Sequence, residues 1–248
     1  MTDLIKMVQG RVYNLAIPYY KNQFSFQISE HPITPYGNQK NSYFLDASKL
    51  NSDSIIYSCG VGNDISFDLD LIQKKSCKIF AFDPTDSCVN YLKTISLPEE
   101  FIFEQIGVAG SSEIKSFRHL RRKRKTYLAA TLLSSDTIDF EVEQMQCLSI
   151  KDIMKKNSHS HIDVLKMDIE GGEYETLEKM FNDHIFPTQI AFEFHPIALN
   201  ENRNLSIWSP YGWKKSQSFV GEILSYGYQI VHQSKKGTEL SLIKKNSL

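Results

Sequence analysis

The sequence predicts an α/β fold: a Rossmann-like, mostly parallel sheet with helices on both faces, closed by an antiparallel hairpin. Two observations support this prediction. Short apolar runs alternate with helical patterns from about residue 54 to residue 195, which is typical of βαβ units in a parallel sheet. Near the end of the chain, two strand patterns flank a short turn that contains Gly237, and this indicates an antiparallel pair.

The predicted elements come in a regular order. Strands are expected over the apolar runs, and helices where apolar residues recur at helical spacing. The expected strands are Ser54–Ser58, Lys78–Phe82, Phe101–Ile106, Ile162–Asp168 and Gln189–His195, followed by YQIVHQ and TELSLIK. The expected helices are the stretch after the glycine turn through Lys74, Ser87–Ile95, Ser149–Lys156, the segment after Gly172, and Gln217–Tyr226.

The length of 248 residues suits one large domain, or one domain with appendages. Residues 1–50, which prolines and a glycine punctuate, are expected to form a lead-in or lid segment, and residues 51–248 the α/β domain. The 28 basic and 29 acidic residues leave a formal charge of -1. This balance, and the lack of an RNA-binding motif, argue against nucleic acid as the partner.

Nothing in the sequence predicts a membrane span, because no apolar run reaches about 18 residues. The first twenty residues lack the compact apolar region of a signal peptide. The four cysteines have neither a C-x-x-C pair nor the spacing of metal ligands. Reduced thiols in a cytoplasmic compartment are therefore expected.

A glycine loop, YSCGVGND, joins the first predicted strand to the first helix. Gly60 and Gly62 allow the backbone to turn tightly and to approach a ligand closely. Asp83, followed by Pro84, ends the next strand and lies 23 residues beyond Gly60, where an acidic side chain can bind both hydroxyls of a ribose. Together these features predict a site for a nucleoside cofactor.

The glycine spacing favours S-adenosylmethionine over NAD. The dinucleotide fingerprint places a third glycine three residues after the second, and Ile65 occupies that position. S-adenosylmethionine needs the ribose acid and the close backbone but has no pyrophosphate to bind.

The segments YSCGVGNDISFDLDL, AFDPT, IGVAG and above all DVLKMDIEGGEYETL resemble the FkbM-type methyltransferases, in the branch similar to methyltransferase-like protein 24. The resemblance covers roughly Tyr36 to His195. It implies a class I methyltransferase fold with seven strands, the last one antiparallel, and residues 51–248 as the methyltransferase domain. It also implies that Gly60, Gly62 and Asn63 line the methionine end of the cofactor, that Asp83 holds the ribose, and that Gly107 and Val108 flank the adenine.

Two positions depart from the wider superfamily. Ser58 stands where an acidic residue commonly precedes the first glycine, and Asp64 replaces the usual third glycine of the loop. Asp64 is therefore a candidate for the carboxylate that Ser58 does not supply. Ser58, Asp64, Pro84 and Asp168 complete the expected cofactor-binding set.

Carboxylates crowd the end of the strand that contains Met167. Ligands bind beyond the carboxyl ends of strands in such a sheet, so Asp168 and Glu170 are the functional candidates. Glu173 and Glu175 fall in the first turn of the next helix, where negative charge is favourable, and are interpreted as capping and solvated residues. Lys166 is ambiguous: pairing with a neighbouring carboxylate is the favoured interpretation, and a catalytic role is the alternative.

Glu193 and His195 end the following strand, two residues apart. Methyl transfer to a hydroxyl requires a base, and histidine suits that role near neutral pH. Alternatively, Asp168, Glu193 and His195 could hold Mg²⁺ or Mn²⁺, as in sugar O-methyltransferases that resemble this fold, and the metal would acidify the hydroxyl. Both mechanisms remain open at this stage.

Two further segments bear on the acceptor. The run RHLRRKRK, Arg118–Lys125, is interpreted as a solvated loop by default, and alternatively as a grip on an anionic acceptor such as a phosphate or nucleotide-linked sugar. The aromatic segment Ser206–Trp213 is either core or a stacking surface for a sugar ring.

The sequence therefore predicts an S-adenosylmethionine-dependent O-methyltransferase that acts on a sugar hydroxyl of a glycan or glycoconjugate. The acceptor class follows mainly from the resemblance. Two alternatives remain: a methyltransferase for a protein, RNA or small natural product, and a non-catalytic module that binds the cofactor. Retention of Asp83, Asp168, Glu193 and His195 counts against the second alternative, because a module that only binds needs no base.

Overall fold

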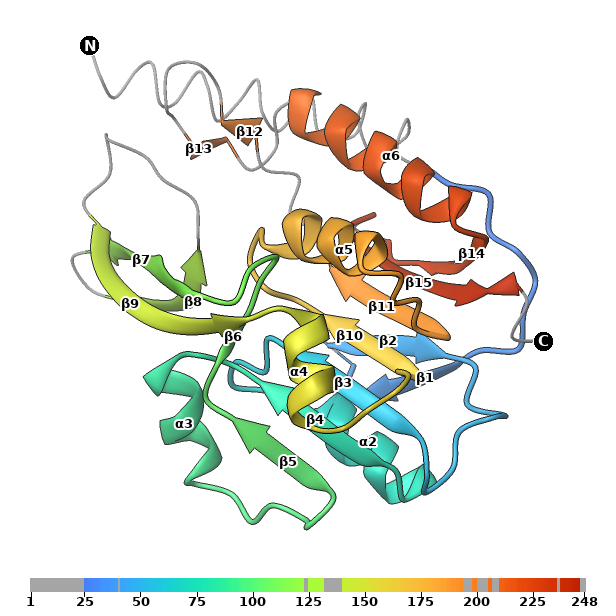
Figure 1. Cartoon of the computed structure of the whole chain (residues 1–248), viewed down its shortest axis with the longest axis horizontal. Helices are drawn as coiled ribbons and strands as arrows, with labels where there is room; N and C mark the ends of the chain where they lie inside the picture. The colour runs from blue at the N-terminus through green and yellow to red at the C-terminus, as the bar shows by residue number, and fades with distance from the viewer. Residues whose placement is uncertain are drawn as a thin grey trace.

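The computed structural model describes residues 25–39, 41–122, 125–131, 140–193, 198–199, 205–206, 210–235 and 237–245. Its centre is a seven-stranded sheet in the order β14-β15-β11-β10-β3-β4-β5 (Figure 1). These strands are β3 (Ile55–Cys59), β4 (Lys78–Phe82), β5 (Phe101–Glu104), β10 (Val164–Met167), β11 (Gln189–Glu193), β14 (Tyr228–Gln233) and β15 (Glu239–Lys244). Each lies within two residues of a predicted strand.

The direction of the strands confirms the predicted fold. From β11 to β5 all neighbouring strands are parallel, whereas β15 runs antiparallel to both β11 and β14. The order and the single reversed strand are those of the class I methyltransferase fold. β3 to β5 extend the sheet in one direction and β10 and β11 in the other, so the carboxyl ends of β3 and β10 flank the switch point where such sheets bind ligands.

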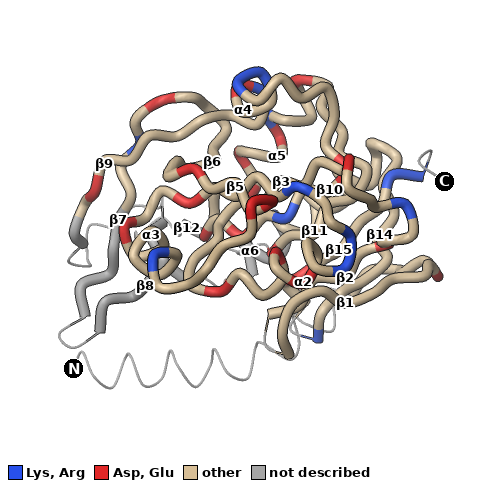
Figure 2. The backbone as a smooth tube through the Cα atoms, turned by 90° about the horizontal axis from the view of Figure 1, so that it is seen from below, with Lys and Arg blue, Asp and Glu red and all other residues tan. Residues whose placement is uncertain are grey.

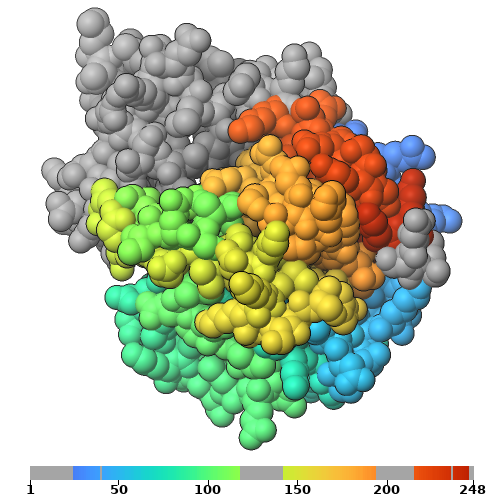
Figure 3. Space-filling model, in the orientation of Figure 1, coloured from blue at the N-terminus to red at the C-terminus, as the bar shows by residue number. Residues whose placement is uncertain are grey.

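In the part of the chain that the structure describes, five helices cover the two faces of the sheet: α2 (Ser66–Lys75), α3 (Asp86–Leu92), α4 (Ile150–Lys156), α5 (Glu173–Asn182) and α6 (Pro210–Ser225). α4, α5 and α6 pack on one face and lie on the side of the molecule that Figure 3 shows. α2 and α3 pack on the other. Thr85 and Ser149 cap α3 and α4 by accepting hydrogen bonds from backbone N–H groups three residues on. α6 begins seven residues before the predicted helix.

Alternation along β10 divides its side chains between these two faces, as predicted. Val164 belongs to the core under α2, and Leu165 and Met167 to the core under α4 and α5. Lys166 is therefore on the α2 face, beside Ser58 of β3 in the register.

The region between β5 and α4 differs from the prediction. It forms β6 (Gly107–Val108), β7 (Ile114–Arg122), β8 (Lys125–Thr131) and β9 (Phe140–Leu148), a second sheet in the order β6-β9-β7-β8. The interpretation of RHLRRKRK as a loop is wrong for the backbone, because most of the run lies on β7 and the start of β8. Hydrogen bonds to β9, more than twenty residues away, hold β7 extended, and local composition does not reveal such a partner. The side chains of this run are outside the described part of the chain.

The amino-terminal region contributes a hairpin, β1 (Thr34–Gly37) and β2 (Ser42–Leu45). Its Tyr36 and Leu45 are buried with residues of α2, so this hairpin is part of the core. A lid function for residues 1–50 stays a prediction. A further short pair, β12 (Ala198–Leu199) and β13 (Leu205–Ser206), precedes α6; most of the aromatic segment Ser206–Trp213 and all of His195 are outside the described residues.

Charge and cysteine usage agree with the composition. Acidic and basic residues are interspersed along the described chain (Figure 2). The four cysteines, Cys59, Cys77, Cys88 and Cys147, are buried and free. Among the described helices, none combines the length and the apolar character that crossing a membrane requires.

Candidate active site

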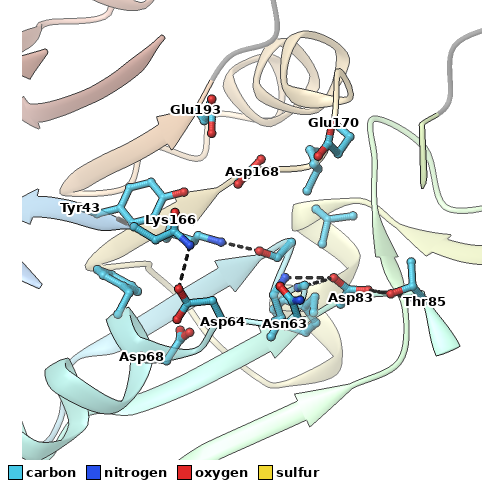
Figure 4. Close-up of a pocket in the computed structure, with 18 of the residues that line it drawn as sticks. Tyr43, Asn63, Asp64, Asp68, Asp83, Thr85, Lys166, Asp168, Glu170 and Glu193 are labelled. Carbon is cyan, nitrogen blue, oxygen red and sulfur yellow. Dashed lines mark hydrogen bonds between the residues drawn. The ribbon is translucent and has the colours of Figure 1, made fainter. Parts of the chain in front are cut away.

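A cavity of about 580 Å³ opens at the carboxyl ends of β3, β4, β10 and β11. Most of the residues predicted from the sequence line it. They are Gly60, Gly62, Asn63, Asp64, Asp83, Pro84, Gly107, Val108, Asp168, Glu170 and Glu193. Asp64 lies on the α2 side of the cavity, while Asp168, Glu170 and Glu193 lie on the opposite side (Figure 4). Ser58 does not line the cavity, because it is fully buried beneath it.

Close approach of two strand ends explains the glycine at position 60. Its φ is +79°, and a Cβ atom there would lie 1.7 Å from the carbonyl oxygen of Asp168. The adjoining backbone of Asp168 is anchored as well, since its N–H donates to the carbonyl of Cys59 at 2.9 Å. The glycine loop and the carboxylate-rich end of β10 therefore form one rigid unit at the switch point.

Asp83 has more protein partners than expected. One carboxylate oxygen accepts hydrogen bonds from the N–H groups of Val61 and Gly62 at 3.1 and 2.9 Å. The other accepts from the N–H and the hydroxyl of Thr85 at 2.9 and 2.6 Å. With these four donors, about all of the acceptor positions of a carboxylate are used. In this structure Asp83 holds the glycine loop in place, in addition to lining the cavity.

Asp64 is similarly committed to the protein. It accepts hydrogen bonds from the side chains of Asn38 and Asn41, both at 2.7 Å, and from the N–H of Ser66 at 2.9 Å. Burial opposes its ionisation, but these hydrogen bonds outweigh burial and lower the pKa of the Asp64 carboxyl. Asp64 thus ties the β1–β2 turn to the start of α2.

Asp68 is the residue of this wall that the sequence analysis missed. It lies in the first turn of α2, is only 2% exposed, and lines the cavity. Burial raises the pKa of its carboxyl to about 6, although the positive charge of Lys166 acts in the opposite direction. Its Oδ1 atom and the hydroxyl of Ser58, which face each other, form no hydrogen bond of normal geometry with any described group.

Lys166 reaches the same wall from β10. Its side chain is buried and donates to the carbonyl of Gly60, and its Nζ atom lies 5.4 Å from the centre of the Tyr43 ring. It forms no ion pair with a carboxylate among the described residues. The expected pairing of Lys166 with a neighbouring carboxylate is therefore wrong, because its nearest anchor is a backbone oxygen.

The double glycine after Met167 forms a tight turn. Glu170 and Gly171 both have positive φ values, +54° and +103°. Glu173 is completely buried and accepts hydrogen bonds from the N–H groups of Ile169 and Gly171 at 3.0 and 2.9 Å. Of the two roles expected for Glu173, capping is confirmed by these hydrogen bonds. Solvation is wrong, because the side chain is buried. Glu175 is half-exposed and pairs with Lys115 of β7 at 2.8 Å.

The opposite side of the cavity is acidic. Asp168, Glu193 and Glu239 line it, and Glu193 and Glu239 are paired in register on neighbouring strands. Burial raises the pKa of the Tyr43 hydroxyl well above its ordinary value, and the three carboxylates raise it further. Tyr43 is thus a neutral hydrogen-bond donor or acceptor at this end, not a base. Sequence analysis missed Tyr43 and Glu239 because they come from the hairpins at the two ends of the chain.

A metal site is not formed by the described residues. No group of three His, Cys, Asp or Glu side chains among them is arranged to hold an ion. His195, the third member of the expected set, is outside that part of the chain.

A comparison with models of protein families identifies the family of this chain. The model of the family described as the methyltransferase FkbM domain matches residues 35–230. The chain belongs to this family. FkbM membership supports an enzyme that transfers methyl groups, in agreement with the sheet topology. A search of curated proteins found no significant match.

Two solved structures with a similar fold are distant in sequence from this FkbM protein. An rRNA methylase from Streptococcus thermophilus is 10% identical, with a TM-score of 0.41, over 80% of this chain and 90% of that one. TrmK of M. capricolum, in complex with S-adenosyl-homocysteine, is 12% identical, with a TM-score of 0.39, over 80% and 66%. At these values the likeness carries no information about the substrate.

Proposed function

We propose that this FkbM protein is an S-adenosylmethionine-dependent O-methyltransferase that methylates a sugar hydroxyl of a glycan or glycoconjugate. One observation carries the proposal: a single cavity joins the glycine-loop wall to an acidic wall across the switch point. Its volume is in the range of cavities that bind small molecules. The first wall suits a nucleoside cofactor and the second suits an acceptor with several hydroxyl groups.

The described residues fit the cofactor. Gly60, Gly62 and Asn63 provide backbone without large side chains, and Gly107 and Val108 provide an apolar lining. Asp83 and Pro84 are placed to meet the ribose, although Asp83 must share an oxygen that already accepts protein hydrogen bonds. The buried Oδ1 of Asp68 has no hydrogen bond of normal geometry to any described residue, as expected for a wall that is completed by a polar ligand. When bound, S-adenosylmethionine would supply an electrophilic methyl group.

The acidic wall supports an alcohol acceptor. An alcohol loses its proton only with the help of a positioned base, and Asp168 and Glu193 are carboxylates at the required end of the cavity. A neutral Tyr43 hydroxyl can donate a hydrogen bond to another oxygen of the acceptor. An acceptor with a phosphate or nucleotide group would have to keep its negative charge away from this wall, for example toward the basic β7–β8 hairpin.

The test is methyl transfer itself, followed by mass spectrometry of a panel of unmethylated glycans, nucleotide sugars, peptides and RNA. We expect a mass increase of one methyl group on a neutral glycan. Exchange of Asp168 for Asn should lower kcat by about 100-fold or more, whereas Glu175→Gln, a change in the same segment outside the cavity, should leave kcat unchanged. Methylation confined to peptide or RNA would contradict the sugar acceptor, and cofactor binding without any transfer would indicate a binding module.

Metal dependence is tested in the same assay. The described residues alone do not build a metal site, and the carboxylate base needs none. If Asp168 or Glu193 acts as a base without a metal, turnover should survive EDTA. Loss of turnover in EDTA and its recovery with Mg²⁺ or Mn²⁺ would favour the set of Asp168, Glu193 and His195 as metal ligands, with His195→Ala weakening the response to added metal.

A further inference from the structure

Three buried polar side chains meet beneath the glycine loop. Lys166 and Ser58 are neighbours in the register of β10 and β3, and Asp68 faces them from the first turn of α2. Their side chains are 6%, 0% and 2% exposed. Burying a lysine and a carboxylic acid costs free energy unless both find partners. Asp68 Oδ1 and Ser58 Oγ interact with each other without a hydrogen bond of normal geometry, and neither has another partner among the described groups.

We propose that Lys166 and Asp68 bind the amino acid end of the cofactor, with Lys166 binding its carboxylate and Asp68 its ammonium group. The inference rests on the proposed use of S-adenosylmethionine and adds the residues that recognise its charged end. Ser58 is buried beneath these two residues, outside the cavity lining, and is not expected to contact the ligand directly.

The first three backbone N–H groups of the glycine loop are not available to bind the carboxylate of the cofactor, because each already donates to the protein. The N–H groups of Val61 and Gly62 donate to Asp83, and the N–H of Gly60 donates to the carbonyl of Phe82 at 2.9 Å. A ligand carboxylate at this wall therefore needs another cation or donor. Lys166 is that group: it lines the cavity, and among the described residues its ammonium group donates a hydrogen bond to the carbonyl of Gly60 alone.

The ammonium group likewise has one suitable partner on this side. Asp64 is a nearby carboxylate, but it already accepts three hydrogen bonds from Asn38, Asn41 and Ser66. Asp83 accepts four. Asp68 is the carboxylate of this wall that retains a buried oxygen without a hydrogen bond of normal geometry to a described residue, and a charged hydrogen bond to it is among the strong ones.

Charge balance supports the same ligand. One buried cation and one buried carboxylate match a zwitterion, whose two charges are fixed a short distance apart. A phosphate or a dicarboxylate would pair with Lys166 but would be repelled by Asp68. The Tyr43 ring, which lies 5.4 Å from Lys166 Nζ, closes the wall on the side of the acceptor and favours a positive charge at that point.

The experiment compares two ligands by calorimetry: S-adenosylhomocysteine, which has the amino acid end, and 5′-methylthioadenosine, which lacks it. We expect the protein to bind S-adenosylhomocysteine at least about 100-fold more tightly, as two charged hydrogen-bonding partners would give. The variants Lys166→Met and Asp68→Asn should each lose about tenfold or more of this ratio. Both should keep their affinity for methylthioadenosine, which also shows that they are folded.

Lys78→Met and Asp53→Asn serve as controls, because both side chains are exposed and away from the cavity. They should leave the ratio unchanged. An equal affinity of Lys166→Met and wild-type protein for S-adenosylhomocysteine, or a parallel loss of affinity for both ligands, would overturn the inference while the proposed function stands. If the unmodified protein bound neither ligand, the proposed function would fail first.

Discussion

Two buried aspartates lie on either side of the same glycine loop and differ in how completely the protein satisfies them. Asp83 accepts four hydrogen bonds from the loop and from Thr85. Asp68 is more deeply buried, yet one of its oxygens forms no hydrogen bond of normal geometry within the part of the chain that the structure describes. The same type of side chain thus serves two purposes: Asp83 shapes the site, and Asp68 is left for a ligand to complete.

The difference follows from where each residue is placed. Asp83 follows the last residue of β4, next to the loop amides that leave β3, so local backbone donors surround it. Asp68 is on a helix, whose backbone N–H groups beyond the first turn bond within the helix. Its charge faces β10, where Lys166 bonds to a backbone carbonyl instead. The comparison can be tested by removing each carboxylate in turn.

The largest effect is expected for Asp83→Ala. The change removes the acceptor of two loop amides and of both Thr85 donors, and buried donors without a partner are costly. We expect a loss of about 3–5 kcal/mol in the free energy of unfolding, measured with urea, together with a loss of cofactor binding. Thr85→Val removes one of the four hydrogen bonds together with the side-chain cap of α3, and should cost about 2 kcal/mol. Full stability of Asp83→Ala would show that the four bonds do not hold the loop.

Asp68→Asn should have the opposite effect on stability at high pH. Burial raises the pKa of Asp68 from 3.8 to about 6. The ionised carboxylate therefore destabilises the ligand-free protein above about pH 6. Below pH 4 the carboxyl group is protonated, and this destabilisation is absent. A shift of about two units corresponds to about 3 kcal/mol. The stability of the variant relative to wild type should therefore increase by about this amount between pH 4 and pH 8. A pH-independent difference would mean that Asp68 is already paired.

Asp64→Asn is expected to have the smallest effect on the free energy of unfolding. Its effect at neutral pH should have the opposite sign to that of Asp68→Asn. The pKa of Asp64 is lowered by hydrogen bonds from Ser66 and two asparagines, against the effect of burial. Its carboxylate therefore stabilises the protein above the unfolded pKa, and this contribution is lost as the pH falls through the lower folded pKa. Because the group is only partly buried and solvent screens its charge, we expect the variant to lose about 1 kcal/mol or less at pH 7. A gain in stability at pH 7 would contradict the assigned hydrogen bonds.

Much of this arrangement could be predicted from the sequence. The βαβ alternation, the glycine loop and the carboxylates after Met167 are local patterns, and they place most of the expected residues at one cavity. Asp68 could not be recognised, because an aspartate in the first turn of a helix is ordinary on the surface and only the packing of α2 on β10 buries it. Tyr43 and Glu239 come from hairpins whose positions depend on contacts far apart in the chain.

The second sheet shows the same limit. β7 carries four basic residues without regular alternation and resembles a solvated loop in sequence, and its pairing with β9 holds it as a strand. Glu173 was correctly assigned to the start of a helix, but its burial depends on the strained turn at Glu170 and Gly171. Motif spacing therefore predicted which residues gather at the sheet edge, but not which of their hydrogen bonds the protein itself completes.

Titration of Asp68 provides the most direct measurement, because its surroundings fix the sign of the response. The charged groups that face it are Lys166 and Asp64, while the thiols of Cys77 and Cys88 have pKa values that burial raises to about 11 and 12 and are therefore neutral near pH 6. Tyr43, whose pKa is raised well above its ordinary value, is neutral there too. Near pH 6, a change in proton binding at this wall can therefore be assigned to Asp68.

The decisive measurement is the number of protons released when S-adenosylhomocysteine binds at pH 6, obtained by calorimetry in buffers of different ionisation enthalpy. About half of the Asp68 side chains are protonated at this pH, and an ammonium group placed beside the carboxylate should remove that proton. We predict the release of about half a proton per ligand, and none from Asp68→Asn or on binding of 5′-methylthioadenosine. Equal proton release by wild type and Asp68→Asn, or proton uptake by wild type, would contradict the account.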